Sequence, residues 1–120
     1  AAVLGTKNDN YEKVFDINFM PNYEIIKFYT NQKLNKKVNI ILIGSTSYKK
    51  GKGNYVLYTA SKAALNNLYQ AAKEIFEKTS VKVSIFHPPR FKSKLIKNLK
   101  YNNKLKNIDG ITDSLLKYVK

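Results

Sequence analysis

The feature that most constrains the fold is a strand-like run at residues 38–43, followed by a long helical pattern and a second strand-like run at 81–86. The first run is nearly continuous in apolar, mostly β-branched residues, as expected for a strand that is buried on both faces. Residues 55–79 between the two runs carry apolar side chains at helical spacing. Because a strand, a helix and a strand in this order join parallel neighbours in a sheet, the sequence predicts an α/β fold.

A further helix is expected before the first strand, over residues 11–29, where apolar side chains again recur at helical spacing. Asn10 is suited to cap its start. Pro21 should interrupt it near Asn18, because proline lacks an N–H and clashes with the preceding turn. No internal repeat or linker divides the sequence, so residues 1–120 are predicted to form part of one domain.

The formal net charge of +14 raises the question of nucleic-acid binding, because clustered lysines neutralise phosphates. The lysines are spread over every segment, however, and Arg90 is the one arginine that could make forked contacts to bases. A lysine-rich composition on solvated faces is the preferred interpretation, and nucleic acid is not an expected partner. The absence of cysteine excludes a disulfide framework and fits a cytoplasmic location. No apolar run approaches the roughly 20 residues of a membrane span.

Tyr58 and Lys62 are four positions apart in the longest predicted helix, so their side chains share one face. A free tyrosine has a pKa of about 10, and a neighbouring ammonium group favours the phenolate. Such a pair is suited to general acid and base chemistry. The spacing alone is weak evidence, because a lysine follows four other tyrosines at the same distance: Tyr23, Tyr29, Tyr48 and Tyr69.

Ser45 distinguishes Tyr58 from the other tyrosines. It follows the first predicted strand and lies 13 positions before Tyr58, whereas none of the other four tyrosines has a serine at that distance. Ligands of open α/β sheets bind beyond the carboxyl ends of the strands, so Ser45 and the start of the Tyr58 helix should meet there. Thr46 and Ser47 compete with Ser45 for this role.

Over roughly its first 95 residues, the chain resembles the short-chain dehydrogenase/reductase family. Five segments carry the resemblance, in the family's order and spacing: Ala-Ala-Val-Leu-Gly at 1–5, Phe-Asp-Ile-Asn at 15–18, Ile-Gly-Ser at 43–45, Tyr-Thr-Ala-Ser-Lys at 58–62 and His-Pro-Pro-Arg-Phe-Lys-Ser at 87–93. The resemblance implies the C-terminal part of a Rossmann-like, doubly wound parallel sheet. The glycine-rich N-terminal half of that fold is absent from this sequence.

The resemblance also implies an oxidoreductase that transfers hydride between NAD or NADP and a carbonyl or alcohol substrate. Tyr58 would donate or accept the substrate proton, and Lys62 would favour its phenolate and bond the nicotinamide ribose. Ser45 would hold the carbonyl oxygen. Asn18, at the helix interruption, would support a water that links Lys62 to solvent.

Cofactor contacts are implied for five residues: Tyr58, Lys62, Pro88, Phe91 and Ser93. Ser93 has an alternative role as the cap of a following helix. No metal site is expected, because the single histidine, His87, has no second histidine or cysteine to join it.

Pro89 stands where the family usually has glycine. This Pro-x-Arg form, together with the Lys-Gly-Lys run at 50–52, is similar to the reductase domain that is fused to cytidylyltransferases in ribitol-phosphate synthesis. In a reductase of that kind, basic loop residues would hold a sugar or polyol phosphate. Because the family's glycine-rich turn is not in this sequence, the 120-residue chain alone is expected to bind cofactor weakly and to turn over little or nothing.

The expected partners are a small carbonyl or alcohol substrate and a second copy of the chain. In the family, the helices that correspond to residues 11–29 and 55–79 usually build the oligomer interface. Two other functions stay open at this point. One is a catalytically inactive family member that serves assembly, and the other is a basic nucleic-acid-binding module.

Overall fold

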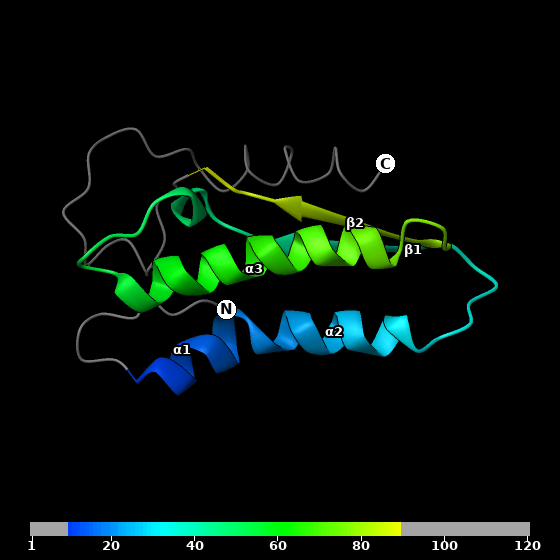
Figure 1. Ribbon diagram of the computed structural model, residues 1–120, viewed down its shortest axis with the longest axis horizontal. Coiled ribbons are helices and arrows are strands. Elements are labelled where there is room, and N and C mark those ends of the chain that lie inside the picture. Colours follow the sequence, from blue (N-terminus) through cyan, green and yellow to red (C-terminus); the bar gives the residue numbers. More distant parts are fainter. Residues whose placement is uncertain (1–9, 90–120) are drawn as a thin grey trace.

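The computed structural model describes residues 10–89, which form a two-stranded parallel sheet with helices packed beside it. The elements in chain order are α1 (Tyr11–Asn18), α2 (Met20–Thr30), β1 (Val38–Ile43), the 3-10 turn η1 (Thr46–Lys49), α3 (Val56–Ile75) and β2 (Val81–Phe86). Figure 1 shows α3 running alongside the strands, with α1 and α2 beside it. The predicted α/β order of strand, helix and parallel strand is confirmed.

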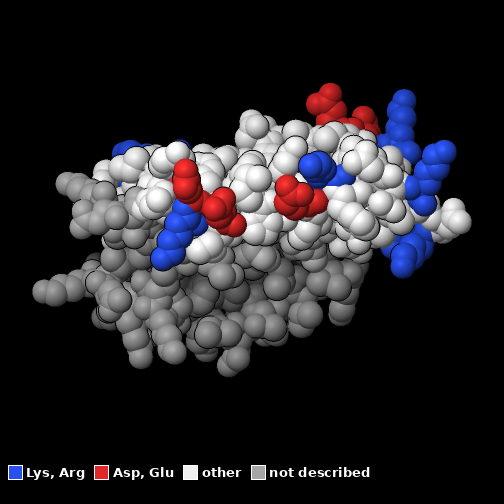
Figure 2. Space-filling model, turned by 90° about the horizontal axis from the view of Figure 1, so that it is seen from below, with Lys and Arg blue, Asp and Glu red and all other residues white. Residues whose placement is uncertain are grey.

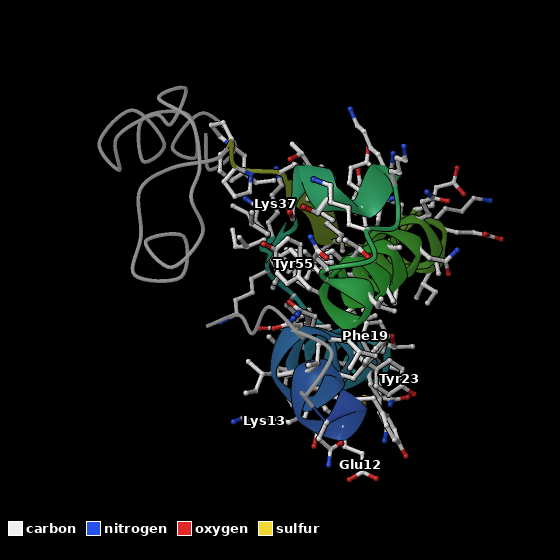
Figure 3. All side chains as sticks on the ribbon, turned by 90° about the vertical axis from the view of Figure 1, so that its left-hand side faces the viewer. Glu12, Lys13, Phe19, Tyr23, Lys37 and Tyr55 are labelled. Atoms are coloured by element: carbon white, nitrogen blue, oxygen red, sulfur yellow. The ribbon has the colours of Figure 1, made fainter. Side chains whose placement is uncertain are left out.

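The helix expected over residues 11–29 is interrupted at Phe19, one residue after Asn18. Pro21 lies in the first turn of α2, where its missing N–H removes no helical hydrogen bond. Asn10 caps α1, because its side chain accepts a hydrogen bond from the Glu12 N–H at 2.8 Å. In Figure 3, Phe19 and Tyr23 lie next to each other just after the interruption, with their rings stacked at 6.4 Å.

The two strands end level with each other. Their parallel register runs from Val38 opposite Val81 to Ile43 opposite Phe86. The ladder continues one step further, since the Gly44 N–H donates to the Phe86 carbonyl at 2.7 Å. The residues that follow β1 and β2 are thereby brought to one edge of the sheet.

The core lies between the strands and the helices. Leu42 on β1 and Leu65 on α3 are almost completely buried, and Ile26 on α2 belongs to the same cluster. Within residues 10–89, the helices cover only one face of β1. Ile43, on the other face, is 46% exposed. The prediction that this strand is buried on both faces is therefore not met in the described part of the chain, where the helices lie against the face of Leu42.

The long helix is shorter than the predicted 55–79, because α3 ends at Ile75. Thr79 forms the turn that leads into β2. Its hydroxyl donates to the Phe76 carbonyl at 2.9 Å and accepts from the Val81 N–H at 3.1 Å. A polar side chain that bonds its own main chain in this way competes with helix continuation, which explains the earlier end.

The surface of the helical side carries both signs of charge. In Figure 2, acidic side chains lie over the middle of this face, and basic side chains gather at the end where α2 is connected to β1. That connection, residues 31–37, contains Lys33, Lys36 and Lys37, all exposed. Within residues 10–89, none of the helices combines the length and the apolar character that crossing a membrane requires.

We expect the substitution Leu65→Ala to lower the free energy of unfolding by about 2–5 kcal/mol, because it removes fully buried methyl groups and leaves a cavity. The matched control is Ile75→Ala on the same helix, where the side chain is 50% exposed. Urea denaturation followed by circular dichroism measures both variants. Equal losses would mean that Leu65 is not in the core.

Candidate active site

Three of the predicted site residues surround the carboxyl end of β1. Ser45 comes two residues after the strand, and Lys62 reaches the strand end from α3, where its Nζ donates to the Ile43 carbonyl at 3.3 Å. Tyr58 lies one turn earlier on α3, with its ring centre 5.8 Å from the same Nζ. The tertiary structure therefore brings the phenol and the ammonium group of the sequence motif to the strand end that Ser45 follows.

Lys62 is unusual for a lysine, because it is only 6% exposed. Burial disfavours the charged form and lowers the pKa of its ammonium group from the ordinary 10.5. Its hydrogen bond to the Ile43 carbonyl partly replaces the lost hydration. Buried charges are rarely kept without such a partner, which makes Lys62 a candidate for function.

The pair of Tyr69 and Lys73, on the same helix, shows what distinguishes Tyr58 and Lys62. Lys73 Nζ lies 5.6 Å from the Tyr69 ring centre, as close as in the candidate site. Lys73 is exposed, however, and lies near the far end of α3. The contact between ring and ammonium therefore follows from the helical spacing, whereas burial against a strand end belongs to Lys62.

Ser45 begins the turn that follows β1. Its backbone is extended, with φ −160° and ψ 146°, and its hydroxyl oxygen accepts a hydrogen bond from the Ser47 N–H at 3.1 Å. This contact caps η1 and fixes the side chain at the strand end. Of its two competitors, Thr46 is exposed to solvent, and Ser47 uses its main-chain N–H to hold Ser45.

Asn18 is 2% exposed, and its amide group contacts the helix that carries Tyr58. Its Nδ2 donates to the Ser61 hydroxyl at 3.1 Å, and the Ser61 hydroxyl donates to the Tyr58 carbonyl at 2.8 Å. The Asn18 carbonyl accepts a hydrogen bond from Asn22 Nδ2 at 3.2 Å. A buried hydrogen-bond chain thus connects the interruption to the main chain of Tyr58.

Ser61 and Asn22 make positioning contacts that were not predicted from the sequence. Ser61 is completely buried, and a polar group that loses its partner in such a place costs about 1–3 kcal/mol. The available signal was a serine three positions after Tyr58 on the helix, one turn away and therefore within reach of the Tyr58 carbonyl. That its other partner is Asn18 follows only from the packing of α1 on α3.

The predicted cofactor residues are described in part. Pro88 is half-buried and follows β2, so it lies at the same edge of the sheet as Ser45. Phe91 and Ser93 lie outside the described residues 10–89. Within that range, no group of three or more His, Asp or Glu side chains is placed to hold a metal ion.

This arrangement can bind and move protons. A buried ammonium beside a half-buried phenol offers hydrogen-bond donors to hydroxyl oxygens. Ser45 adds a hydroxyl at the adjoining strand end. These are the groups that a proton transfer to or from an oxygen atom requires.

The model of a known protein family matches residues 2–104 of the chain. That family is described as short chain dehydrogenase. The chain belongs to the short-chain dehydrogenase family. The family includes nicotinamide-dependent oxidoreductases. No sequence among curated proteins matches the chain.

Solved structures of short-chain dehydrogenases share the fold. One from Salmonella enterica is 18% identical with a TM-score of 0.78, with 97% of this chain and 52% of that one covered. One from Burkholderia cenocepacia, in complex with NADP, is 13% identical with a TM-score of 0.75, and the match covers 95% of this chain and 53% of that one. A 4-hydroxyisoleucine dehydrogenase complexed with NADH is 23% identical with a TM-score of 0.73, and the match covers 100% of this chain and 56% of that one. The chain spans about half the length of these structures.

We expect Lys62→Met to raise the thermal midpoint at pH 7 by a few degrees, because it removes a charge whose burial disfavours the folded state. The folded pKa is lowered, so the penalty is complete below that pKa and disappears as the pH rises to 10.5. The gain from Lys62→Met should shrink over the same range. Thermal unfolding at pH 7 and pH 10 measures it.

The control is Lys73→Met, which has the same spacing to a tyrosine but changes an exposed side chain. We expect it to alter the free energy of unfolding by no more than about 0.5 kcal/mol. A lower midpoint for Lys62→Met than for Lys73→Met would mean that the hydrogen bond to Ile43 outweighs the burial of the charge.

Proposed function

We propose that this chain supplies the catalytic, C-terminal half of an NAD(P)-dependent oxidoreductase that acts on a carbonyl or alcohol substrate. The supporting observation is the buried Lys62 ammonium, which extends from α3 to the end of β1 beside Tyr58. Membership of the short-chain dehydrogenase family supports the same reaction class. Two proteins of similar fold were solved with NADP and with NADH, which supports a nicotinamide nucleotide as the cofactor.

The donor groups at the strand end fit one end of such a cofactor. The Lys62 ammonium and the Tyr58 hydroxyl are suited to hydrogen-bond the two hydroxyl groups of a ribose. When bound, the nicotinamide supplies or accepts the hydride. Tyr58 donates a proton to the substrate oxygen in reduction and removes it in oxidation, while the Ser45 hydroxyl holds that oxygen in place. Pro88, Phe91 and Ser93 are assigned to the nicotinamide side.

Asn18 is assigned to the same site as the residue that holds Tyr58 in position and supports the proton path from Lys62. Its amide acts on the first turn of α3 through Ser61. This contact fixes the main chain at Tyr58, so the phenol has fewer accessible positions and is held near the strand end. Preorganisation of this kind is how an enzyme reduces the entropy lost on reaching the transition state.

The substrate class that we favour is a sugar or polyol phosphate, in line with the ribitol-phosphate subgroup. Lys49, the last residue of η1, and Lys50 after it are both exposed, and Lys52 lines a cavity of about 400 Å³ beside Tyr48. Three cations within four positions are suited to a phosphate group. Because the glycine-rich turn is not in this sequence, we expect the 120-residue chain alone to bind cofactor weakly and to show little or no turnover.

The decisive experiment joins this chain to the glycine-rich N-terminal half of a short-chain dehydrogenase. Oxidation of NADH and NADPH is then followed at 340 nm with aldehydes, ketones and phosphorylated sugars. We expect Tyr58→Phe to reduce kcat by roughly 10²–10⁴-fold, because it removes the group that exchanges the proton.

The matched control is Tyr69→Phe, which alters a tyrosine with the same distance to a lysine but away from the strand ends. It should leave kcat within a factor of about two. If Tyr58→Phe is as active as Tyr69→Phe in an active fusion, Tyr58 is not the proton donor and the mechanism is wrong. Comparison of each phosphorylated substrate with its unphosphorylated form tests the substrate class.

We further propose that two copies associate through the helices of residues 11–29 and 55–79. Phe28 on α2 is 57% exposed and Ile25 is 45% exposed, and Ile75 on α3 adds a further apolar side chain at the surface. Exposed apolar side chains in such numbers on neighbouring helices are typical of surfaces that associate. The alternative function, a catalytically inactive family member that serves assembly, would use the same surface.

We expect Phe28→Glu to lower the sedimentation coefficient of the chain to that of a monomer, because it places a charge in the apolar contact. The control is Lys27→Glu at the preceding position. Sedimentation velocity at several concentrations measures both variants. A monomeric wild-type chain, or equal behaviour of the two variants, would contradict association through this surface.

A further inference from the structure

His87 lies directly after β2, at the same edge of the sheet as Ser45, and it is the only histidine in the chain. Its ring stacks on the ring of Tyr48 in η1, with the centroids 4.3 Å apart and 22° between the planes. The imidazole therefore bridges the end of β2 and the turn that Ser45 begins. The proposed chemistry assigns no task to either ring of this stack.

Gly44 provides the space that the His87 ring occupies. A Cβ atom at position 44 would lie 2.4 Å from Nδ1 and 2.5 Å from Cε1 of His87. The ring thus rests directly on the main chain that precedes Ser45, while the Gly44 N–H is bonded to the Phe86 carbonyl. The stack with Tyr48 and the contact with Gly44 hold the ring on two sides.

The surroundings of His87 favour an uncharged ring. Within residues 10–89 its Nδ1 is buried without a hydrogen-bond partner. Burial lowers the pKa of His87 below its ordinary 6.5, the main chain of Ser45 acts in the opposite direction, and the positive charges of Lys49 and Lys62 lower it again. Tyr48 of η1 is in contact with the ring, and the charged groups near enough to lower its pKa are Lys49 of η1 and Lys62 of α3.

We propose that His87 is a positioning residue for Ser45: its uncharged ring, held between Tyr48 and Gly44, fixes the turn that presents the Ser45 hydroxyl, and protonation of the ring releases that turn. The proposal rests on the proposed function, since it assigns a pH-dependent control to the same site. In this proposal, the stacking contact with Tyr48 holds the His87 ring in place.

The physical reason is the cost of charging the ring where it lies. A protonated His87 would add a positive charge near Lys49 and Lys62, and partial burial would deprive the charged ring of hydration, whereas a hydrogen bond to the Ser45 main chain acts in the opposite direction. The charged ring gains hydration by leaving Gly44, and the turn around Ser45 then loses its support. Because the folded pKa is lowered, the support is complete above about pH 6.5 and is lost as the pH falls through the folded pKa.

The single histidine allows a direct test on the 120-residue chain. We follow the imidazole signals and the Ser45 and Ser47 amides by NMR between pH 4.5 and 8.5. We expect the imidazole to titrate below pH 6.5, and both amides to shift with the same midpoint. Lys49→Gln should move the midpoint upward, whereas the control Lys50→Gln at the next position should leave it unchanged.

Activity gives the second measurement, in the fusion used for Tyr58. We expect kcat, and not KM, to fall at acidic pH with the midpoint found by NMR. His87→Gln keeps an uncharged polar side chain and should remove this acidic limb, whereas a merely structural role would leave the limb in place and lower kcat at every pH.

The outcomes separate the two proposals. If the Ser45 and Ser47 amides do not follow the titration of His87, or if His87→Gln retains the wild-type acidic limb, the positioning role is wrong even in an active enzyme. If the amides follow the titration but Tyr58→Phe remains fully active, the proposed mechanism fails while the link between His87 and Ser45 stands.

Discussion

The site depends on one buried charge, the Lys62 ammonium at the carboxyl end of β1. Its hydrogen bond to the Ile43 carbonyl joins α3 to the strand, and it places Tyr58 one turn away at the same edge. An ammonium group in this position disfavours the folded state through lost hydration, and a chain selected for stability alone would have an apolar side chain there. The burial of Lys62 therefore supports the role in proton chemistry that we propose for it.

A second buried contact, from α1, holds the start of α3 in place. The interruption at Phe19 ends α1 at Asn18, and the Asn18 amide reaches Tyr58 through the Ser61 hydroxyl. The Asn18 carbonyl also accepts a hydrogen bond from Asn22 Nδ2, so both polar groups of this residue are held at the interruption. The proline that breaks the helix is thus linked, over some forty residues of sequence, to the position of the proposed proton donor.

The elements that local sequence patterns define were predictable. Both strands have the predicted bounds, and the interruption by Pro21 lies one residue from its predicted place, because β-branched runs and proline act on the backbone locally. The end of α3 was predicted four residues too late, because the Thr79 hydroxyl bonds the main chain and turns it toward β2. The exposure of Ile43 depends on what covers the second face of the sheet, which the pattern of one strand does not specify.

By itself, the sequence determined the order of the elements, the family and the helical face shared by Tyr58 and Lys62. Spacing along a helix is fixed by backbone geometry, so Tyr69 and Lys73 show the same contact without any site. The Ser45 spacing singled out Tyr58 in the sequence, but only the tertiary structure showed that Lys62 is almost completely buried and that His87 rests on Gly44. Burial and contacts between distant segments arise from packing α3 on the sheet, and no local pattern of residues carries that information.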